Sequence, residues 1–198
     1  MIKKASIIVS VFLLGFMLTA CDSSSSVEGT PYPVVTIEIE GFGVIELVLF
    51  PDVAPNTVRN FVSLIESGYY DGVGFHRIIE NFMVQGGRGD ALSCRIEGEF
   101  TNNNFTNDIA HVRGVISMAR TMDPNSATGQ FFIVHQTSPH LDGNYASFGM
   151  MTKGWDVLDA IASIQTGAND APTEAVVITR MTVNTFGVDY QPPVCYDS

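Results

Sequence analysis

The sequence predicts a mainly-β domain, built as a closed antiparallel barrel whose ends are capped by two α-helices. Three observations lead to this prediction. Apolar and polar residues alternate with a period of two in many short segments, as in strands. Two isolated segments change to the helical period. Stretches rich in glycine and asparagine separate the segments, as expected of turns and loops.

The first elements are a hairpin and a helix. Two alternating strands surround Gly41-Phe42-Gly43, which is a hairpin pattern. Residues 54–68 then read APNTVRNFVSLIESG, a helix of about three turns, because apolar residues recur at i, i+3, i+4 and i+7. Asn56 or Thr57 can cap its start, and Gly68 can end it. The apolar stripe facing the core comprises Val58, Phe61, Val62 and Ile65.

A second hairpin carries an arginine among apolar residues. Its predicted strands are Phe75–Ile79 and Met83–Gly86, joined by a turn at residues 80–82. This turn places Ile79 opposite Met83 and Arg77 opposite Gln85, so that a cation and an amide border an apolar patch. Such a patch can orient an apolar ligand that has one or two polar groups. The alternative is an ordinary strand arginine that faces solvent.

The remaining elements complete the barrel. Residues 154–164, GWDVLDAIASI, form the second predicted helix, with Trp155, Leu158, Ile161 and Ala162 at helical spacing. The domain therefore extends over residues 32–187, followed by a tail at 188–198. Four further strand-like segments read GVISMA, QFFIV, SFGMM and AVVITRMTV.

The N-terminus has the pattern of an export signal. Residues 1–20 combine two lysines with a short apolar run, and Leu18-Thr19-Ala20-Cys21 resembles a bacterial lipobox, in which the cysteine is acylated. The alternative is an ordinary secretory signal that ends near a cysteine. Residues 21–31 are polar and serine-rich, as in a flexible tether. Asp22 resembles an inner-membrane retention signal, so we expect a lipid-anchored protein of the bacterial envelope that faces the periplasm.

Composition excludes several classes of partner and chemistry. The 198 residues carry a net charge of −11, and loss of residues 1–20 leaves 8 basic and 21 acidic residues, or −13. The folded part is therefore a poor partner for nucleic acid or anionic membrane surfaces. No nucleophile elbow or phosphate loop is present. The four histidines lack metal-ligand spacing, so no metal is expected, and His76 is predicted to be a hydrogen-bonded core residue.

Two cysteines remain in the mature chain, Cys94 and Cys195. They allow one possible disulfide, which an exported protein can keep, or they are two unpaired thiols. A bridge is expected to hold the C-terminal tail in place and to have no part in chemistry.

Long motifs resemble the cyclophilins, the cyclosporin-binding family of peptidyl-prolyl isomerases. The motifs are GYYDGVGFHRIIENFMVQGG, GVISMARTMDPNSATGQFFI, LDGNYASFGMMTKGWDVLDAI and VAPNTVRNFVSLI, and the likeness covers Val34 to Val183. The loop in MARTMDPNSAT resembles the bacterial exported branch. The resemblance implies an eight-stranded barrel and isomerisation of Xaa–Pro bonds without a cofactor.

The resemblance also implies the site. Arg77 matches the catalytic arginine, Gln85 matches a glutamine that holds the substrate backbone, and Ala119 and Arg120 match the strip that pairs with residues before proline. The walls of the proline pocket correspond to Phe82, Met83, Phe132 and Leu141. The implied substrate-binding set is Ile79, Phe82, Met83, Gln85, Ala119, Arg120, Gln130, Phe132, His140, Leu141 and Tyr145.

Three positions depart from the common pattern. His140 replaces a tryptophan that contacts cyclosporin, so we expect the drug to bind weakly. Tyr145 replaces a pocket histidine, and we expect activity with altered preference. Arg120 stands where many members have asparagine, and we expect little harm because that position works through its backbone.

The sequence thus favours a monomeric, membrane-tethered isomerase that assists the folding of exported proteins. One alternative is a chaperone or assembly module that binds proline-containing segments with incidental turnover. Another is a structural envelope lipoprotein with an idle domain of this kind. An intact Arg77 favours the enzyme, because a pure binder has less need of that arginine.

Overall fold

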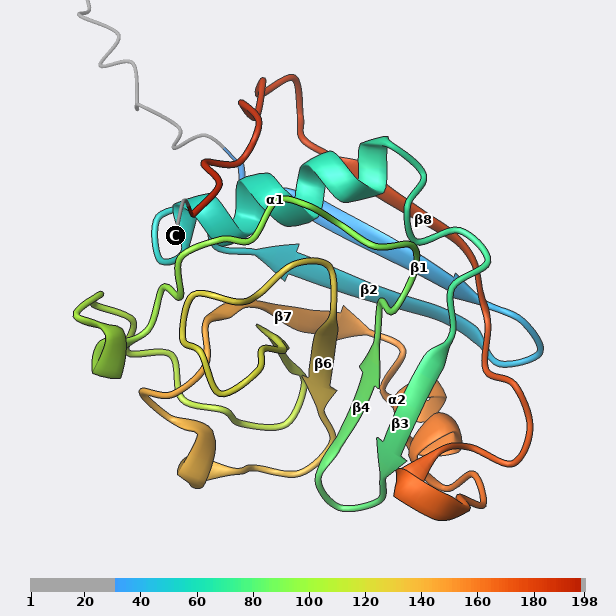
Figure 1. The fold of residues 1–198 in the computed structure, drawn as a ribbon. Helices are drawn as coiled ribbons and strands as arrows, with labels where there is room; N and C mark the ends of the chain where they lie inside the picture. The colour runs from blue at the N-terminus through green and yellow to red at the C-terminus, as the bar shows by residue number, and fades with distance from the viewer. Residues whose placement is uncertain (1–30, 197–198) are drawn as a thin grey trace, which may run out of the picture.

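The computed structural model describes residues 31–196, which form a strongly curled, eight-stranded antiparallel sheet with two α-helices packed on it (Figure 1). The strands are β1 Val34–Ile39, β2 Gly43–Leu49, β3 Phe75–Ile79, β4 Met83–Gly86, β5 Val115–Met118, β6 Phe131–Val134, β7 Ser147–Lys153 and β8 Ile178–Asn184. The helices are α1 Pro55–Glu66 and α2 Trp155–Ala162, with short 3₁₀ helices η1 Thr101–Asn103, η2 Pro139–Leu141 and η3 Ala168–Asp170. The predicted signal peptide, Cys21 and nearly all of the tether lie outside the described residues.

The ends of the sheet are strands β3 and β8, in the order β3-β4-β6-β5-β7-β2-β1-β8. One isolated antiparallel bridge, between Gly74 and Val177, joins the segments that lead into these two strands. No ladder between β3 and β8 completes the ring of strand pairs in residues 31–196. The mainly-β antiparallel architecture is confirmed, whereas the closed barrel is not.

The second hairpin has the register predicted from its sequence. Arg77 lies opposite Gln85, and Ile79 lies opposite Met83. A bulge falls between Phe75 and Arg77, so that His76 has no direct partner on β4. A β-bulge changes the direction in which nearby side chains point, and this bulge lies immediately before Arg77.

Strands β4 and β6 place apolar residues on both faces, and those on the two faces belong to different hydrophobic clusters. The pair Val84 and Ile133 points into the main core beneath α1. The neighbouring pair Met83 and Val134 belongs to a second, smaller hydrophobic cluster. Successive strand residues point to opposite faces, so these strands bury one set of side chains in the core and offer the other set to a site. The smaller cluster contains Met83, Val115, Phe132, Val134 and Leu141.

Helix α1 buries the predicted apolar stripe, but its start is capped differently from the prediction. Pro55 occupies the first turn, and neither Asn56 nor Thr57 caps the helix with its side chain. The buried Glu99 carboxylate instead accepts the backbone N–H groups of Asn56 (2.9 Å) and Thr57 (2.7 Å). A carboxylate is favoured there because helix N-termini present free N–H donors and partial positive charge. Gly68 follows the helix with φ +73°, as predicted for its end.

Helix α2 buries three of the four residues that the sequence placed at helical spacing. Leu158, Ile161 and Ala162 are buried as expected, but Trp155 is 38% exposed and Val157 is buried in its place. The indole lies over Gly114 and beneath the guanidinium of Arg113, 5.6 Å from the ring centre. Trp155 therefore covers the surface at the start of the helix and does not enter the core.

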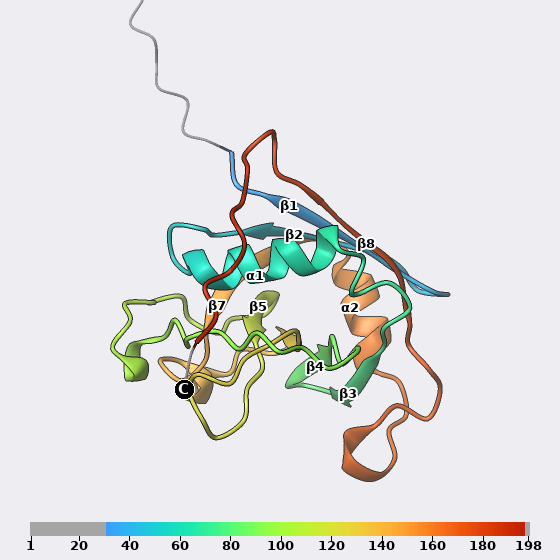
Figure 2. The same cartoon turned by 45° about the horizontal axis from the view of Figure 1, so that its top comes forward.

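The C-terminal tail returns across α1 and ends near the start of that helix (Figures 1 and 2). Cys195 forms a disulfide with Cys94, 101 residues earlier. Val194 and Asn56 exchange two hydrogen bonds of 2.8 and 2.9 Å. Of the two alternatives for the cysteines, the structure has the bridge, and it attaches the tail to the domain. Within residues 31–196 no helix has the length and apolar character needed to span a bilayer.

Candidate active site

A pocket of about 140 Å³ opens between β3, β4, β6 and the loops at 119–120 and 141–145. It brings together nine of the twelve residues that sequence analysis assigned to catalysis and substrate binding. The lining residues are Arg77, Phe82, Met83, Gln85, Ala119, Arg120, Phe132, Leu141 and Tyr145.

Apolar side chains form the floor and walls of the pocket. Met83, Phe132 and Leu141 are 2%, 5% and 6% exposed, and they belong to the smaller hydrophobic cluster. The Tyr145 ring meets Phe132 edge-on, with centroids 5.6 Å apart. These side chains are held by packing before any ligand arrives, which suits a small, rigid apolar group.

Arg77 provides the positive charge on the wall of this pocket. Its side chain is 42% exposed, and its Nε donates to Oδ2 of Asp170 at 3.1 Å. Within residues 31–196 this is the one hydrogen bond of the Arg77 side chain, so the two terminal amino groups of the guanidinium have no acceptor in the described protein. An arginine presents its donors in a rigid planar fork, so both amino groups are available to a ligand.

Gln85 stands beside Arg77 and is itself held in place. Its Nε2 donates to Oε1 of Gln130 at 3.1 Å, while the Ala119 N–H donates to the backbone carbonyl of Gln130 at 2.9 Å. Gln130 therefore supports two residues of the pocket wall without lining the pocket itself. Both Gln85 and Ala119 also border a neighbouring polar hollow, which continues the pocket toward Thr128.

Arg120 uses its side chain as well as its backbone. The guanidinium lies between two rings, 4.7 Å from the centre of Tyr145 and 5.1 Å from that of Phe100. Its Nε and Nη2 donate to the carbonyl of Asn144 at 3.0 and 2.8 Å. Arg120 thus packs on the face of the Tyr145 ring, a side-chain contact that comes in addition to the backbone role expected from the sequence.

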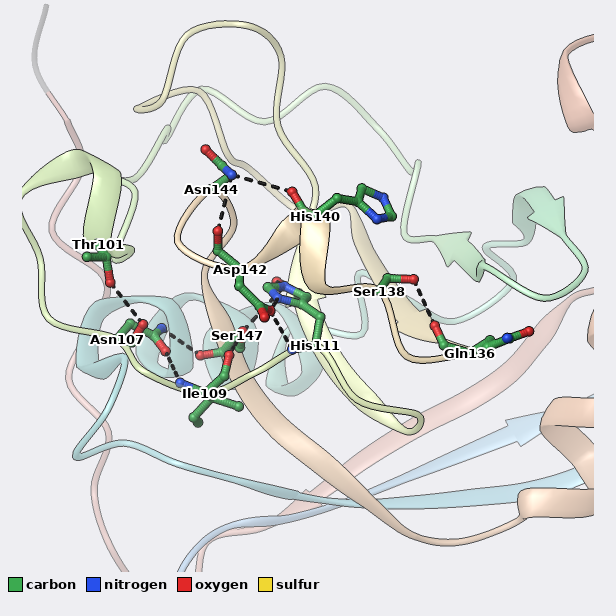
Figure 3. A network of polar contacts seen from close by, with 11 residues as sticks. Thr101, Asn107, Ile109, His111, Gln136, Ser138, His140, Asp142, Asn144 and Ser147 are labelled. Atoms are coloured by element: carbon green, nitrogen blue, oxygen red, sulfur yellow. Dashed lines mark hydrogen bonds and ion pairs between the residues drawn. The ribbon is translucent and has the colours of Figure 1, made fainter.

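A polar network around His111 and Asp142 supports the loop at residues 138–147 (Figure 3). The His111 ring stacks on Phe132 with centroids 6.0 Å apart, and its Nδ1 lies 2.9 Å from Oδ1 of Asp142. The backbone N–H of His111 donates to the same carboxylate oxygen at 2.7 Å. Burial lowers the pKa of His111 although the Asp142 carboxylate opposes the shift. A neutral imidazole therefore packs behind the aromatic wall.

His76 does not have the hydrogen bonds that the sequence analysis predicted. Both ring nitrogens are buried and have no partner within residues 31–196. Burial, assisted by the positive charge of Arg88, lowers the pKa of His76 to about 4. The bulge before Arg77 leaves His76 without a directly paired residue on β4. The His76 ring is therefore neutral at pH 7, and it adds no positive charge beside Arg77.

Three predicted residues lie around the pocket instead of lining it. Ile79 packs against the smaller cluster, and Gln130 supports Gln85. His140 lines a neighbouring hollow, and its ring lies tilted against that of Phe82 with centroids 5.3 Å apart. Sequence reasoning missed Asp170 because nothing in the loop TGANDAP points to a residue 93 positions earlier. The functional roles of the lining residues stay predictions.

Comparisons with known proteins agree with this geometry. The family model described as cyclophilin type peptidyl-prolyl cis-trans isomerase/CLD matches residues 34–183. Peptidyl-prolyl cis-trans isomerase CYP18-1 of Arabidopsis thaliana is 39% identical over 146 residues, which cover 72% of this chain and 91% of the relative. Peptidyl-prolyl cis-trans isomerase B of Escherichia coli is 36% identical, over 72% and 94%. A crystal structure of a cyclophilin type isomerase from Cryptosporidium parvum superposes with a TM-score of 0.70 at 26% identity, over 77% of this chain and 98% of that one.

Proposed function

The chain belongs to the cyclophilin-type peptidyl-prolyl cis-trans isomerase family, and we propose that Arg77 accelerates the reaction by stabilising a pyramidal prolyl nitrogen within the apolar pocket. The reaction is rotation about the bond that precedes proline. Resonance makes that C–N bond partly double, so the uncatalysed barrier is roughly 20 kcal/mol.

The transition state differs from both planar isomers in one respect that a protein can recognise. As the bond twists, the nitrogen loses conjugation, becomes pyramidal and gains a lone pair. A guanidinium directed at this nitrogen makes a bond that hardly exists in the ground state, and only such differential binding increases the rate. One charge-assisted hydrogen bond contributes about 1.5–3 kcal/mol, or roughly 10- to 150-fold in rate.

The pocket supplies the other requirements of the reaction. Its walls of Met83, Phe132 and Leu141 hold the pyrrolidine ring away from water, while Gln85 and the 119–120 strip hold one side of the peptide. The other side is then free to rotate. A dry, preorganised pocket strengthens the interaction of Arg77 with the nitrogen. No nucleophile, proton transfer or cofactor is required.

The observation that carries this proposal is the guanidinium of Arg77 on an apolar pocket wall, with only its Nε occupied by the described protein. We expect Arg77→Ala to lower kcat/KM about 10- to 150-fold, since it removes one charge-assisted bond. Exchange NMR on a succinyl-Ala-Xaa-Pro-Phe peptide measures the rate. Arg113→Ala, which removes an arginine outside the pocket, is the control, and near-normal turnover by a folded Arg77→Ala protein rules the mechanism out.

We also propose that the enzyme works in the bacterial envelope as a monomer, anchored by lipid on Cys21 and acting on exported proteins, with Asp22 favouring the inner membrane. The sequence of residues 1–31 supports the anchor. The Cys94–Cys195 disulfide supports an oxidising compartment, where such bonds persist. Labelled palmitate is expected to enter the wild-type chain and not Cys21→Ser. Incorporation that survives the substitution argues against lipidation at this residue.

Weak binding of cyclosporin is a further part of the proposal. His140 lies on the exposed rim, where its ring contacts that of Phe82 at a tilt of 33°. The smaller imidazole covers less of the drug than an indole, so we expect His140→Trp to bind cyclosporin about tenfold more tightly than the wild type. Isothermal titration measures both affinities, and equal values contradict this explanation.

A further inference from the structure

Asp170 touches Arg77 from a segment that has no other part in the site. Its carboxylate accepts the Nε–H of Arg77 at 3.1 Å, and the two side chains are 43% and 42% exposed. Asp170 does not line the proline pocket. The contact thus occupies Nε, and neither terminal amino group of Arg77 has an acceptor among the described residues.

The loop around Asp170 has a closed, fixed backbone. A bridge joins Thr166 to Pro172, and the N–H of Gly167 donates to the carbonyl of Ala171 at 2.8 Å. Inside this ring, Asn169 and Asp170 both have φ of 59°, in the left-handed region. Asparagine and aspartate adopt that region more readily than other non-glycine residues. The loop therefore presents the Asp170 carboxylate to Arg77 in a defined place.

The ion pair is too exposed to be important for stability. Exposed pairs contribute a fraction of a kcal/mol because water screens both charges. The geometric effect is larger, because the guanidinium is planar and a bond to Nε fixes the plane in which both amino groups lie. A long arginine side chain without this bond has several rotamers, most of which direct the amino groups away from the substrate.

We propose that Asp170 is a positioning residue for isomerisation: by holding Nε, it keeps the amino groups of Arg77 directed at the prolyl nitrogen. This rests on the proposed role of Arg77. Asp170 acts through Arg77 and does not itself line the pocket, so its loss lowers kcat and leaves KM unchanged. Ground-state binding depends on the apolar walls and Gln85, which Asp170 does not contact.

The decisive variant is Asp170→Gly, because glycine removes the carboxylate and still adopts a φ of 59° without strain. Asn169→Gly is the matched control, since it makes the same substitution at the neighbouring left-handed residue, whose side chain is exposed. Asp170→Asn keeps an acceptor for Nε and loses the charge. We expect kcat to fall roughly 3- to 10-fold in Asp170→Gly, from the loss of one hydrogen bond, and to stay within about twofold of wild type in the other two.

Two further measurements separate positioning from a general loss of structure. The ¹⁵Nε–¹Hε resonance of Arg77 is expected to shift and broaden in Asp170→Gly and to stay in place in Asn169→Gly. In an Arg77→Ala background, Asp170→Gly is expected to have no additional effect on kcat, because the group that it positions is gone.

Several outcomes overturn the inference. Wild-type kcat in Asp170→Gly, a raised KM with unchanged kcat, or an equal loss in Asp170→Asn each contradict positioning through Nε. If Arg77→Ala is inactive and Asp170→Gly is normal, the proposed mechanism stands and the role of Asp170 falls. If Arg77→Ala retains full activity, both fall together.

Discussion

Arg120 provides the sharpest test of how the pocket wall is built. The perturbation is Arg120→Ala, which removes a guanidinium stacked between Tyr145 and Phe100 and bonded to the carbonyls of Asn144 and Thr121. A partly exposed cation–π contact contributes about 0.5–1 kcal/mol, and a hydrogen bond from a charged group about 1.5–3 kcal/mol. Water reaches the freed carbonyls, so we expect a loss of about 2–3 kcal/mol in unfolding free energy.

The effect on catalysis follows from Tyr145. Without Arg120, this ring keeps its edge contact with Phe132 and loses the cation stacked against its face. A looser wall positions the proline ring less well, and we expect kcat/KM to fall about 3- to 10-fold, or roughly 0.7–1.4 kcal/mol in the transition state. Exchange NMR with the Xaa–Pro peptide measures the rate, and urea denaturation measures the stability.

Arg113→Ala is the matched control for Arg120→Ala. Arg113 also stacks on a ring, Trp155 at 5.6 Å, and donates to the His135 carbonyl at 3.0 Å, but it lies outside the pocket. Its loss should lower the unfolding free energy by a similar amount, since it too removes a cation–π contact and hydrogen bonds from a charged group, and should leave kcat/KM within about twofold of wild type. If the two variants have the same activity, the side chain of Arg120 has no role in the wall.

Three further predictions concern stability. Glu99→Gln removes the carboxylate that accepts two helix N–H groups, and we expect the unfolding free energy, measured in urea, to fall by about 2–4 kcal/mol. The control is Glu97→Gln at an exposed position, for which we expect the unfolding free energy to fall by less than about 0.5 kcal/mol. The pKa of His76 is about 4 in the fold and about 6.5 when unfolded, so stability present above pH 6.5 is lost as pH falls toward 4. Urea midpoints at pH 7 and 5 should differ less in His76→Gln than in wild type, and equal differences contradict the buried neutral state. Reduction of the Cys94–Cys195 disulfide should lower the unfolding free energy by about 2–5 kcal/mol. It should leave kcat/KM unchanged, because neither cysteine lines the pocket. A changed kcat/KM after reduction would contradict the prediction that the disulfide has no part in catalysis.

The sequence predicted those features that depend on local periodicity. The hairpin that pairs Arg77 with Gln85 follows from two alternating runs and a three-residue turn, and the structure has that register. The apolar stripe of α1 likewise follows from spacing alone. Such patterns are reliable because the side-chain period of a strand or helix is set by backbone geometry.

Features that depend on the path of loops were not predictable in this way. Glu99 caps a helix 42 to 43 residues earlier in the chain, and Asp170 contacts an arginine 93 residues earlier. Neither carboxylate stands in a periodic segment, so nothing in the local sequence indicates its partner. Trp155 has helical spacing with Leu158, but spacing does not reveal that Gly114 and Arg113 offer it a place on the surface.

The separation of the small cluster from the main core has a consequence for how such an enzyme diversifies. Met83, Phe132 and Leu141 belong to the small cluster that lines the pocket, while Phe61, Tyr70 and Phe148 belong to the main core. Substitutions in the small cluster can therefore change the shape of the pocket while the side chains of the main core stay as they are. Proteins with this arrangement can evolve a different substrate preference with little loss of fold stability.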